Sequence, residues 1–171
     1  NKENYFNVVN QIKDVADSFK EKQILVEPAS LNTAPAITYA LKHLAENSGV
    51  DLTAPVIILP SDHYIGDEKR YLEVVKTAMN EVGNHIGTIG ITPTKLETGF
   101  GYIKKGEREG NHFHVLEFKE KPDRWAAQQY INSGQYVWNS GIYIFNIRTF
   151  AGELRLHAPK IYSLLVQDFD T

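Results

Sequence analysis

The chain has 171 residues, of which 42% are hydrophobic and 23% are charged, and its formal net charge at pH 7 is −3. This length and composition suit one globular domain with a real core. The small negative charge gives no electrostatic basis for nucleic-acid binding. There is no cysteine, which excludes disulfides and thiolate metal sites, and no apolar run approaches the roughly 20 residues of a membrane span. We therefore expect a cytoplasmic protein with neither nucleic acid nor membrane as a partner.

The first part of the chain alternates between helical and strand patterns. Helical spacing of apolar residues over 4–20 predicts an amphipathic helix, and Gln23–Glu27 predicts a short strand. A turn follows. A second helix comes next, which Asn32 or Thr33 can cap and which Gly49 can end.

Two more strands and a helix continue this order. The apolar run Val56–Leu59 predicts a buried strand, residues 67–82 predict an amphipathic helix, and His85–Ile91 predicts another strand. Strands that alternate with helices at this spacing are typical of a doubly wound α/β sheet with mostly parallel strands.

After residue 95 the pattern becomes mixed. Tyr102–Lys104 and His114–Phe118 predict two short alternating strands around a turn at 106–111. The remaining expected elements are a helix from about Asp123 to Asn132, a strand Ile142–Asn146, and helical material after Arg148 that Pro159 interrupts. We therefore expect a mixed C-terminal half.

Asp62 directly follows the buried run, in the motif Leu59–His63. In α/β proteins the carboxyl ends of the strands open into the ligand crevice. A carboxylate placed there suits Mg²⁺ that also binds substrate phosphate oxygens. The alternative is that Asp62 or Ser61 is only a turn or capping residue.

Two other motifs bring backbone groups to a possible ligand. The segment Glu27–Ile37 joins a strand end to a helix N-terminus, whose free N–H groups can hold an anion or the edge of a base. It can equally be a well-capped loop. In Glu97–Tyr102, Gly99 and Gly101 let the backbone approach a ligand closely, or they form a tight turn packed by aromatic residues.

The fourth motif, Phe118–Asp123, carries a carboxylate and an ammonium group next to each other. Glu120 for hydroxyls and Lys121 for a phosphate are what a sugar phosphate requires. Adjacent strand residues point to opposite faces, so both line one pocket only if the strand twists or bulges at Pro122. The alternative is a solvated charge cluster in which Asp123 caps the next helix.

The fifth motif is Tyr136–Phe145, in which Asn139 precedes a glycine and an apolar strand. A side-chain amide can both donate to and accept from the vicinal hydroxyls of a sugar. The alternative is a bend that enters a core strand.

Taken together and in order, these motifs resemble the mannose-1-phosphate guanylyltransferase family, of the bacterial type sometimes fused to a phosphomannose isomerase. The stretches that carry the resemblance are Glu27–Ile37, Leu59–His63, Gly90–Ile103, Phe118–Asp123 and Tyr136–Phe145. The resemblance implies a Rossmann-like nucleotidyltransferase (nucleotide-diphospho-sugar transferase) fold. It also implies transfer of GMP from GTP to α-D-mannose 1-phosphate with release of pyrophosphate.

The same resemblance implies the roles of individual residues. Asp62 is expected to be catalytic and to bind Mg²⁺, and Lys121 is expected to be catalytic as the partner of the sugar's phosphate. The two should converge on the rim of one cleft, while the turn Glu27–Thr33 faces the guanine. The expected substrate-binding residues are Glu27, Pro28, Asn32, Thr33, Ser61, Thr98, Gly99, Gly101, Glu120, Asn139 and Ser140.

The chain also departs from the family pattern. The glycine-rich loop that opens the family's domain has no counterpart, nor has a later acidic metal ligand, since Asp168 and Asp170 stand in another context. We therefore expect residues 1–171 to be part of a catalytic domain, without its first strand, that loop and its C-terminal part, and to be inactive alone. The unpaired sheet edge favours a homo-oligomer.

Two rival functions stay open. One is a nucleotidyltransferase for another hexose 1-phosphate. The other is a non-catalytic regulatory subunit with the same fold, which the missing loop favours. Leu31, where the family usually has a basic residue, favours it too.

Overall fold

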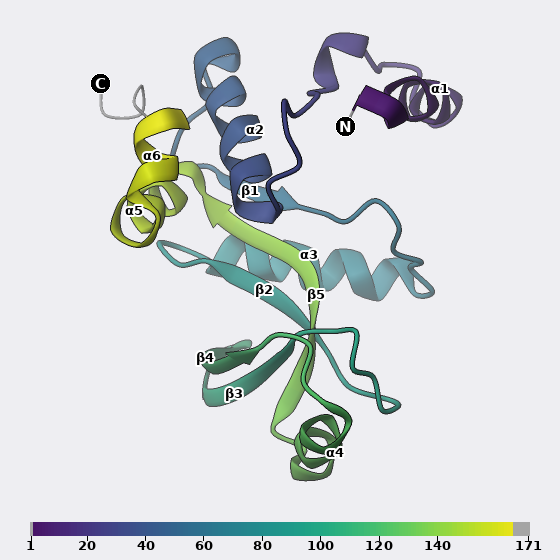
Figure 1. The fold of residues 1–171 in the computed structure, drawn as a ribbon, viewed down its shortest axis with the longest axis vertical. Helices are drawn as coiled ribbons and strands as arrows, with labels where there is room; N and C mark the ends of the chain where they lie inside the picture. Colours follow the sequence, from purple (N-terminus) through teal and green to yellow (C-terminus); the bar gives the residue numbers. More distant parts are fainter. Residues whose placement is uncertain (1, 166–171) are drawn as a thin grey trace. The chain divides into compact units, whose positions relative to one another are not determined.

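The computed structural model describes residues 2–165 and is drawn in Figure 1. The chain forms two compact units, of which the first runs to Leu52 and resumes at Ala151, and the second is Thr53–Phe150. In the described residues, no helix is long and apolar enough to cross a membrane.

The first unit is helical. Leu41 on its longest helix is only 1% exposed, and that helix packs against the last one. Gly49, at φ 56°, ends the longest helix as predicted, and the helical segment that follows Ala158 begins at Pro159. The helical elements are η1 (Lys2–Asn4), α1 (Tyr5–Val15), η2 (Glu21–Gln23), α2 (Thr33–Ser48), α5 (Ile147–His157), which starts at the end of the second unit, and α6 (Pro159–Leu165).

The strand predicted for Gln23–Glu27 is wrong. Gln23 ends the short helix η2, and residues 24–27 have no regular structure. A strand needs a neighbouring strand to satisfy its backbone N–H and C=O groups. The apolar side chains of residues 24–27 favour a strand but do not show whether a neighbouring strand is available.

The second unit is a five-stranded sheet with two helices. Its helices begin at aspartates, since Asp67 accepts a hydrogen bond from the N–H of Arg70 at 2.9 Å and Asp123 accepts one from the N–H of Ala126 at 2.8 Å. The elements are β1 (Pro55–Ile58), α3 (Glu68–Glu81), β2 (Gly87–Ile91), β3 (Tyr102–Glu109), β4 (His112–Lys119), α4 (Arg124–Ser133) and β5 (Tyr136–Asn146).

The prediction of a mostly parallel sheet is also wrong, because the strand pairs of the described residues are antiparallel. β1 and β2 are joined through α3 and do run parallel to each other. However, β5 lies between them, pairing Ile144 with Ile57 of β1 and with Gly87 of β2. The sequence order of strands and helices predicted the crossover correctly, but it gave no sign that a later strand would be inserted between its two strands.

β5 is the strand that joins the two parts of the sheet. One of its edges pairs with β2, and the other pairs with β3 over residues 136–138 and with β1 over residues 143–146. Between these two stretches lie residues 139–142, where β3 and β1 diverge along the same edge (Figure 1). β5 therefore begins at Tyr136, six residues before the strand predicted at Ile142.

The core around the start of β5 is aromatic. Tyr102, Ala127 and Trp138 are buried together, with α4 supplying Ala127 and Tyr130. The rings of Tyr130 and Tyr136 stack at 4.2 Å between centroids. This packing fixes the base of the β3–β4 hairpin against β5.

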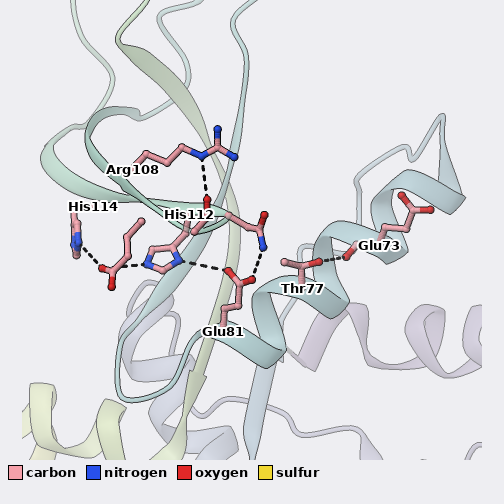
Figure 2. A network of polar contacts seen from close by, with 9 residues as sticks. Glu73, Thr77, Glu81, Arg108, His112 and His114 are labelled. Carbon is pink, nitrogen blue, oxygen red and sulfur yellow. Dashed lines mark hydrogen bonds and ion pairs between the residues drawn. The ribbon is translucent and has the colours of Figure 1, made fainter.

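The tip of the hairpin is tied to the end of α3 by polar contacts (Figure 2). The side-chain amide of Asn111 donates to Glu81 at 2.6 Å, and His112 Nδ1 lies 3.5 Å from the same carboxylate. On the hairpin itself, Glu109 contacts His114 at 3.0 Å. The hydrogen bond from Asn111, together with His112, holds the pKa of the Glu81 carboxyl below its usual 4.5.

We predict that Gly90→Ala destabilises the fold by about 2 kcal/mol, the usual cost of overpacking a filled site. Gly90 lies beside a bulge in β2, and a Cβ there would lie 2.4 Å from Val137 Cγ2. Chemical denaturation measures the change. In the control Gly152→Ala the new Cβ has no atom within 4 Å inside α5, so stability should rise by up to about 1 kcal/mol. Equal effects of the two changes would contradict this packing.

We predict a pH-dependent difference between the wild type and Glu81→Gln. A carboxyl whose pKa is lower in the folded state stabilises the fold above its unfolded value, and this contribution is lost as the pH falls through the lower folded value. The denaturation midpoint of the variant should thus lie below that of the wild type at neutral pH. The two should converge as the pH falls below 4.5. A difference that stays constant down to pH 3 would show that the Glu81 charge is not involved.

Candidate functional site

Three of the sequence motifs meet at the stretch of β5 between its pairings with β3 and β1. The N–H of Asn139 donates to the carbonyl of Gly101 at 2.8 Å, which brings the glycine loop to β5. Gly141, at φ 73°, faces the loop after β1, since a Cβ added to it would lie 3.4 Å from Pro60 Cγ. The loop that carries Asp62 and the loop that carries Gly101 therefore approach neighbouring residues of one strand.

The fourth motif joins the same place through Gly101. Gly101 is buried, and a Cβ added there would lie 2.9 Å from Phe118 Cζ and 3.1 Å from Glu120 Oε2. The lack of a side chain at this position is what lets the end of the hairpin close over the loop. Glu120 is thus held beside Gly101 although its own side chain is mostly exposed.

Lys121 has a left-handed backbone, at φ 43°. β4 ends at Lys119, so the alternation of strand side chains no longer applies, and the ammonium of Lys121 lies 3.5 Å from the carboxylate of Glu120. The sequence analysis required the strand to twist or bulge here if Glu120 and Lys121 were to line one pocket. The left-handed backbone of Lys121 is such a departure from regular strand geometry. Positive φ is uncommon in a residue other than glycine, and such strain gathers at functional sites.

Asn139 is largely satisfied inside the protein. Its Oδ1 accepts from Thr88 Oγ1 at 3.1 Å and from the N–H of Gly141 at 3.2 Å, and its Nδ2 donates to the Tyr143 hydroxyl at 3.1 Å. One N–H of the amide stays available for a ligand. Ser140 is 7% exposed, and its hydroxyl donates to the carbonyl of Ile89 at 2.6 Å, so it stabilises the pairing of β5 with β2.

Sequence reasoning gave no role to Glu97. Its Oε1 accepts from the backbone N–H of Thr98 at 2.9 Å and of Gly99 at 3.0 Å. The bonds from Gly99 and Thr98, and Lys95 nearby, hold the pKa of this carboxyl below its usual value. The sequence feature that could have revealed this role is a glutamate directly before a loop. Polar side chains in turns often accept hydrogen bonds from the N–H groups of the next residues.

The motif Glu27–Ile37 belongs to the first unit. Ser30 Oγ donates to Glu27 Oε1 at 3.4 Å, and Pro28, Asn32 and Thr33 are exposed. Asn32 precedes α2 at φ 74° and ψ −176°, and its side chain makes no capping hydrogen bond, so the predicted Asn32 cap is wrong. A capping residue normally has a β-region backbone, which this φ excludes. Within the described residues, Asn32 and Lys121 are the non-glycine residues with positive φ.

Asp62 is the residue predicted to bind a metal ion. In the part of the chain that the structure describes, no three His, Asp or Glu side chains are grouped so as to hold an ion. Asp62 is an exposed carboxylate in a turn, which fits one ligand of a Mg²⁺ whose other ligands are water and phosphate oxygens. Asp168 and Asp170 lie outside the described residues.

A separate hollow of about 820 Å³ lies on the hairpin. Lys104, Lys105, Phe113, His114 and Gln135 contribute to its lining, and no predicted site residue does. The convergence of Asp62 and Lys121 on one cleft stays a prediction. Lys121 lies next to Glu120, Glu120 lies beside Gly101, and the Gly101 carbonyl accepts from Asn139 of β5. Pro60, in the loop that carries Asp62, lies close to Gly141 of β5.

The chain is similar to curated proteins along most of its length. The chain is 39% identical over 160 residues to the mannose-1-phosphate guanylyltransferase RfbM of Salmonella typhimurium, which covers 92% of this chain and 33% of that protein. It is 41% identical over 163 residues to the xanthan biosynthesis protein XanB of Xanthomonas campestris, over 94% of this chain and 33% of that protein. The chain thus spans about a third of these curated relatives.

Solved structures agree on the fold. A crystal structure from Thermus thermophilus described as a mannose-1-phosphate geranyltransferase has a TM-score of 0.79 and 33% identity, over 90% of this chain and 44% of that one. A crystal structure from Helicobacter pylori described as a mannose-6-phosphate isomerase has a TM-score of 0.78 and 34% identity. The match covers 95% of this chain and 60% of that one. The profile of the family described as Nucleotidyl transferase matches residues 1–170. The chain therefore belongs to the nucleotidyl transferase family.

Proposed function

We propose that the protein carrying this chain is a cytoplasmic mannose-1-phosphate guanylyltransferase. It transfers GMP from GTP to α-D-mannose 1-phosphate and releases pyrophosphate. The observation that carries the proposal is the meeting of Gly101, Glu120, Asn139 and the loop after β1 at one stretch of β5. Relatives named for this activity support the choice of substrates.

The reaction needs little acid–base chemistry. A phosphate oxygen of mannose 1-phosphate attacks the α-phosphorus of GTP, and the bond from that phosphorus to the bridging oxygen of pyrophosphate breaks. The attacking oxygen is already anionic, so no general base has to activate it. Catalysis then rests on in-line positioning and on neutralising the charge of the phosphates.

We assign the charges of the site accordingly. Lys121 neutralises the phosphate of mannose 1-phosphate, and Glu120 accepts hydrogen bonds from sugar hydroxyls. The free N–H of Asn139 donates to another hydroxyl, and the backbone of Thr98, Gly99 and Gly101 lies against the sugar. Mg²⁺ bound to the triphosphate would be held by Asp62, next to Ser61, and would neutralise charge on the leaving pyrophosphate.

The guanine role of Glu27, Pro28, Asn32 and Thr33 rests on the resemblance of this segment to the family. Two local observations are compatible with it. The Asn32 side chain makes no hydrogen bond to the N–H groups in the first turn of α2. Leu31 beside it is 61% exposed.

The test is pyrophosphate release by the full-length protein. We expect the highest kcat/KM with GTP, mannose 1-phosphate and Mg²⁺, compared with ATP, CTP and UTP and with glucose 1-phosphate. A preference for another base or sugar would identify a different nucleotidyltransferase. Absence of turnover with every pair would favour the non-catalytic subunit.

In the same assay, Lys121→Ala should lower kcat/KM about 100-fold, the usual effect of removing one group that stabilises transition-state charge. Asp62→Asn should raise the Mg²⁺ concentration for half-maximal rate about tenfold, as losses around a metal usually do. The exposed Lys69 on α3 provides the matched control, and Lys69→Ala should leave the rate unchanged. Equal losses in Lys69→Ala and Lys121→Ala would contradict the assignment.

We further predict that Gly101→Ala weakens binding of mannose 1-phosphate about tenfold while changing the unfolding free energy by less than about 1 kcal/mol. The atoms nearest to the new Cβ are the outer ends of Phe118 and Glu120, which can move, but Glu120 then leaves its place. Calorimetric titration of the full-length protein measures the affinity.

The control for this change is Gly106→Ala on the same hairpin. Its Cβ would lie 2.9 Å from Leu116 Cγ and 3.1 Å from the carbonyl of His114. This crowding should reduce stability without changing affinity. Unchanged affinity in Gly101→Ala would show that the contact between Gly101 and Glu120 does not shape the sugar site.

A further inference from the structure

The carboxylate of Glu97 binds the backbone of the residues that follow it. Both hydrogen bonds to Oε1 come from the next two residues along the chain, Thr98 and Gly99, at 2.9 and 3.0 Å. Its other oxygen, Oε2, faces the ammonium of Lys95 at 3.7 Å. Both carboxylate oxygens are therefore occupied within this turn, and the side chain is only 29% exposed.

The main chain of Glu97 is anchored as well. The hydroxyl of Tyr102 donates to the carbonyl of Glu97 at 2.7 Å, and Tyr102 is fully buried in the aromatic core. Glu97 therefore accepts hydrogen bonds from both ends of the loop Thr98–Gly101. A carboxylate oxygen accepts at the start of the loop, and the peptide oxygen of the same residue accepts from the first residue of β3.

The loop needs such support because its own sequence does not fix it. Thr98, Gly99 and Phe100 are exposed, and a glycine has the largest freedom to lose on ordering. The rest of the loop is held by the Phe100 ring, which lies against Trp138 at 5.3 Å between centroids, and by the Gly101 carbonyl, which accepts from Asn139. Phe118 and Glu120 also lie beside Gly101. Without Glu97 the two N–H groups would have water as their partner, and the loop would sample other conformations.

We propose that Glu97 is a positioning residue that holds the Thr98–Gly101 loop in the conformation that receives the sugar phosphate. The identity of the ligand rests on the proposed function. The holding of the loop rests on the contacts of Glu97 alone. Its action is through the backbone, so an acceptor oxygen at this position matters and a negative charge does not.

The experiment uses the full-length protein and two readouts. Amide hydrogen exchange of Thr98 and Gly99 reports loop order directly, and steady-state kinetics report KM and kcat for mannose 1-phosphate. In Glu97→Ala we expect both amides to exchange about tenfold faster and KM to rise about tenfold, the effect of losing two ordinary hydrogen bonds. Because the reacting groups are untouched, kcat should change by less than about threefold.

The conservative variant separates geometry from charge. Glu97→Gln keeps an acceptor oxygen, so exchange and KM should both stay within about threefold of the wild type. Lys95→Ala removes the ion-pair partner and should leave both unchanged, since Lys95 is 68% exposed and such pairs contribute little. Tyr102→Phe removes the second anchor and should raise KM in the same direction as Glu97→Ala.

Two results would overturn the proposal. If Glu97→Ala leaves the exchange of the Thr98 and Gly99 amides unchanged, the carboxylate does not hold the loop. If Glu97→Gln is as damaging to KM as Glu97→Ala while exchange stays slow, the charge acts on the ligand itself. Failure of the proposed function gives a different pattern, in which the wild type does not turn over mannose 1-phosphate while the exchange data still decide the role of Glu97.

Discussion

Strand β5 hydrogen-bonds along both of its edges, and the second unit depends on it. It separates β1 from β2 and carries β3 on the same edge as β1, so four strands of the sheet are related to one another through it. Two neighbours on one edge have to diverge somewhere. They do so at residues 139–142, and the loops that leave β1 and enter β3 come together there. The proposed sugar-phosphate site lies at this place, where the sheet is divided.

The geometry at this place is set mostly by the backbone. Gly101 and Gly141 allow close approach of Glu120 and Pro60, and Lys121 takes a left-handed conformation that ends the strand pattern. Polar side chains nearby are used to hold this backbone, as with Asn139, Ser140 and Glu97. The proposed function gives contact with the ligands chiefly to the charges of Asp62, Glu120 and Lys121. A site of this kind suits a reaction that needs alignment of phosphates more than proton transfer.

Sequence patterns predicted the local features well and the long-range ones poorly. The end of α2 at Gly49 and the break before Pro159 depend on residues within one turn of each other, and both are confirmed. The structure also contains the cap at Asp123, which belongs to the alternative interpretation of that motif as a solvated charge cluster. The insertion of β5 between β1 and β2 depends on pairs such as Pro55 with Asn146 and Ile91 with Trp138, which lie far apart in the chain, and no periodicity encodes them. The backbone of Asn32 and Lys121 was equally hidden, because nothing in the residue types themselves requires a positive φ. Residue patterns identified the motifs and their order gave the resemblance to a family, and the contacts then showed which motifs of the second unit meet.

The place of β5 in the chain has a consequence for how the protein forms on the ribosome. β1 ends at Ile58 and β5 begins only at Tyr136, so the nascent chain carries β1, and later β2, before β5 is available to pair with either. At synthesis rates of about 5–20 residues per second, this delay is roughly 4–16 s for β1. The β3–β4 hairpin, whose strands are joined by a short turn, can close during that interval. The pairing of β5 with β1 and β2 is therefore a late step in the synthesis of the second unit.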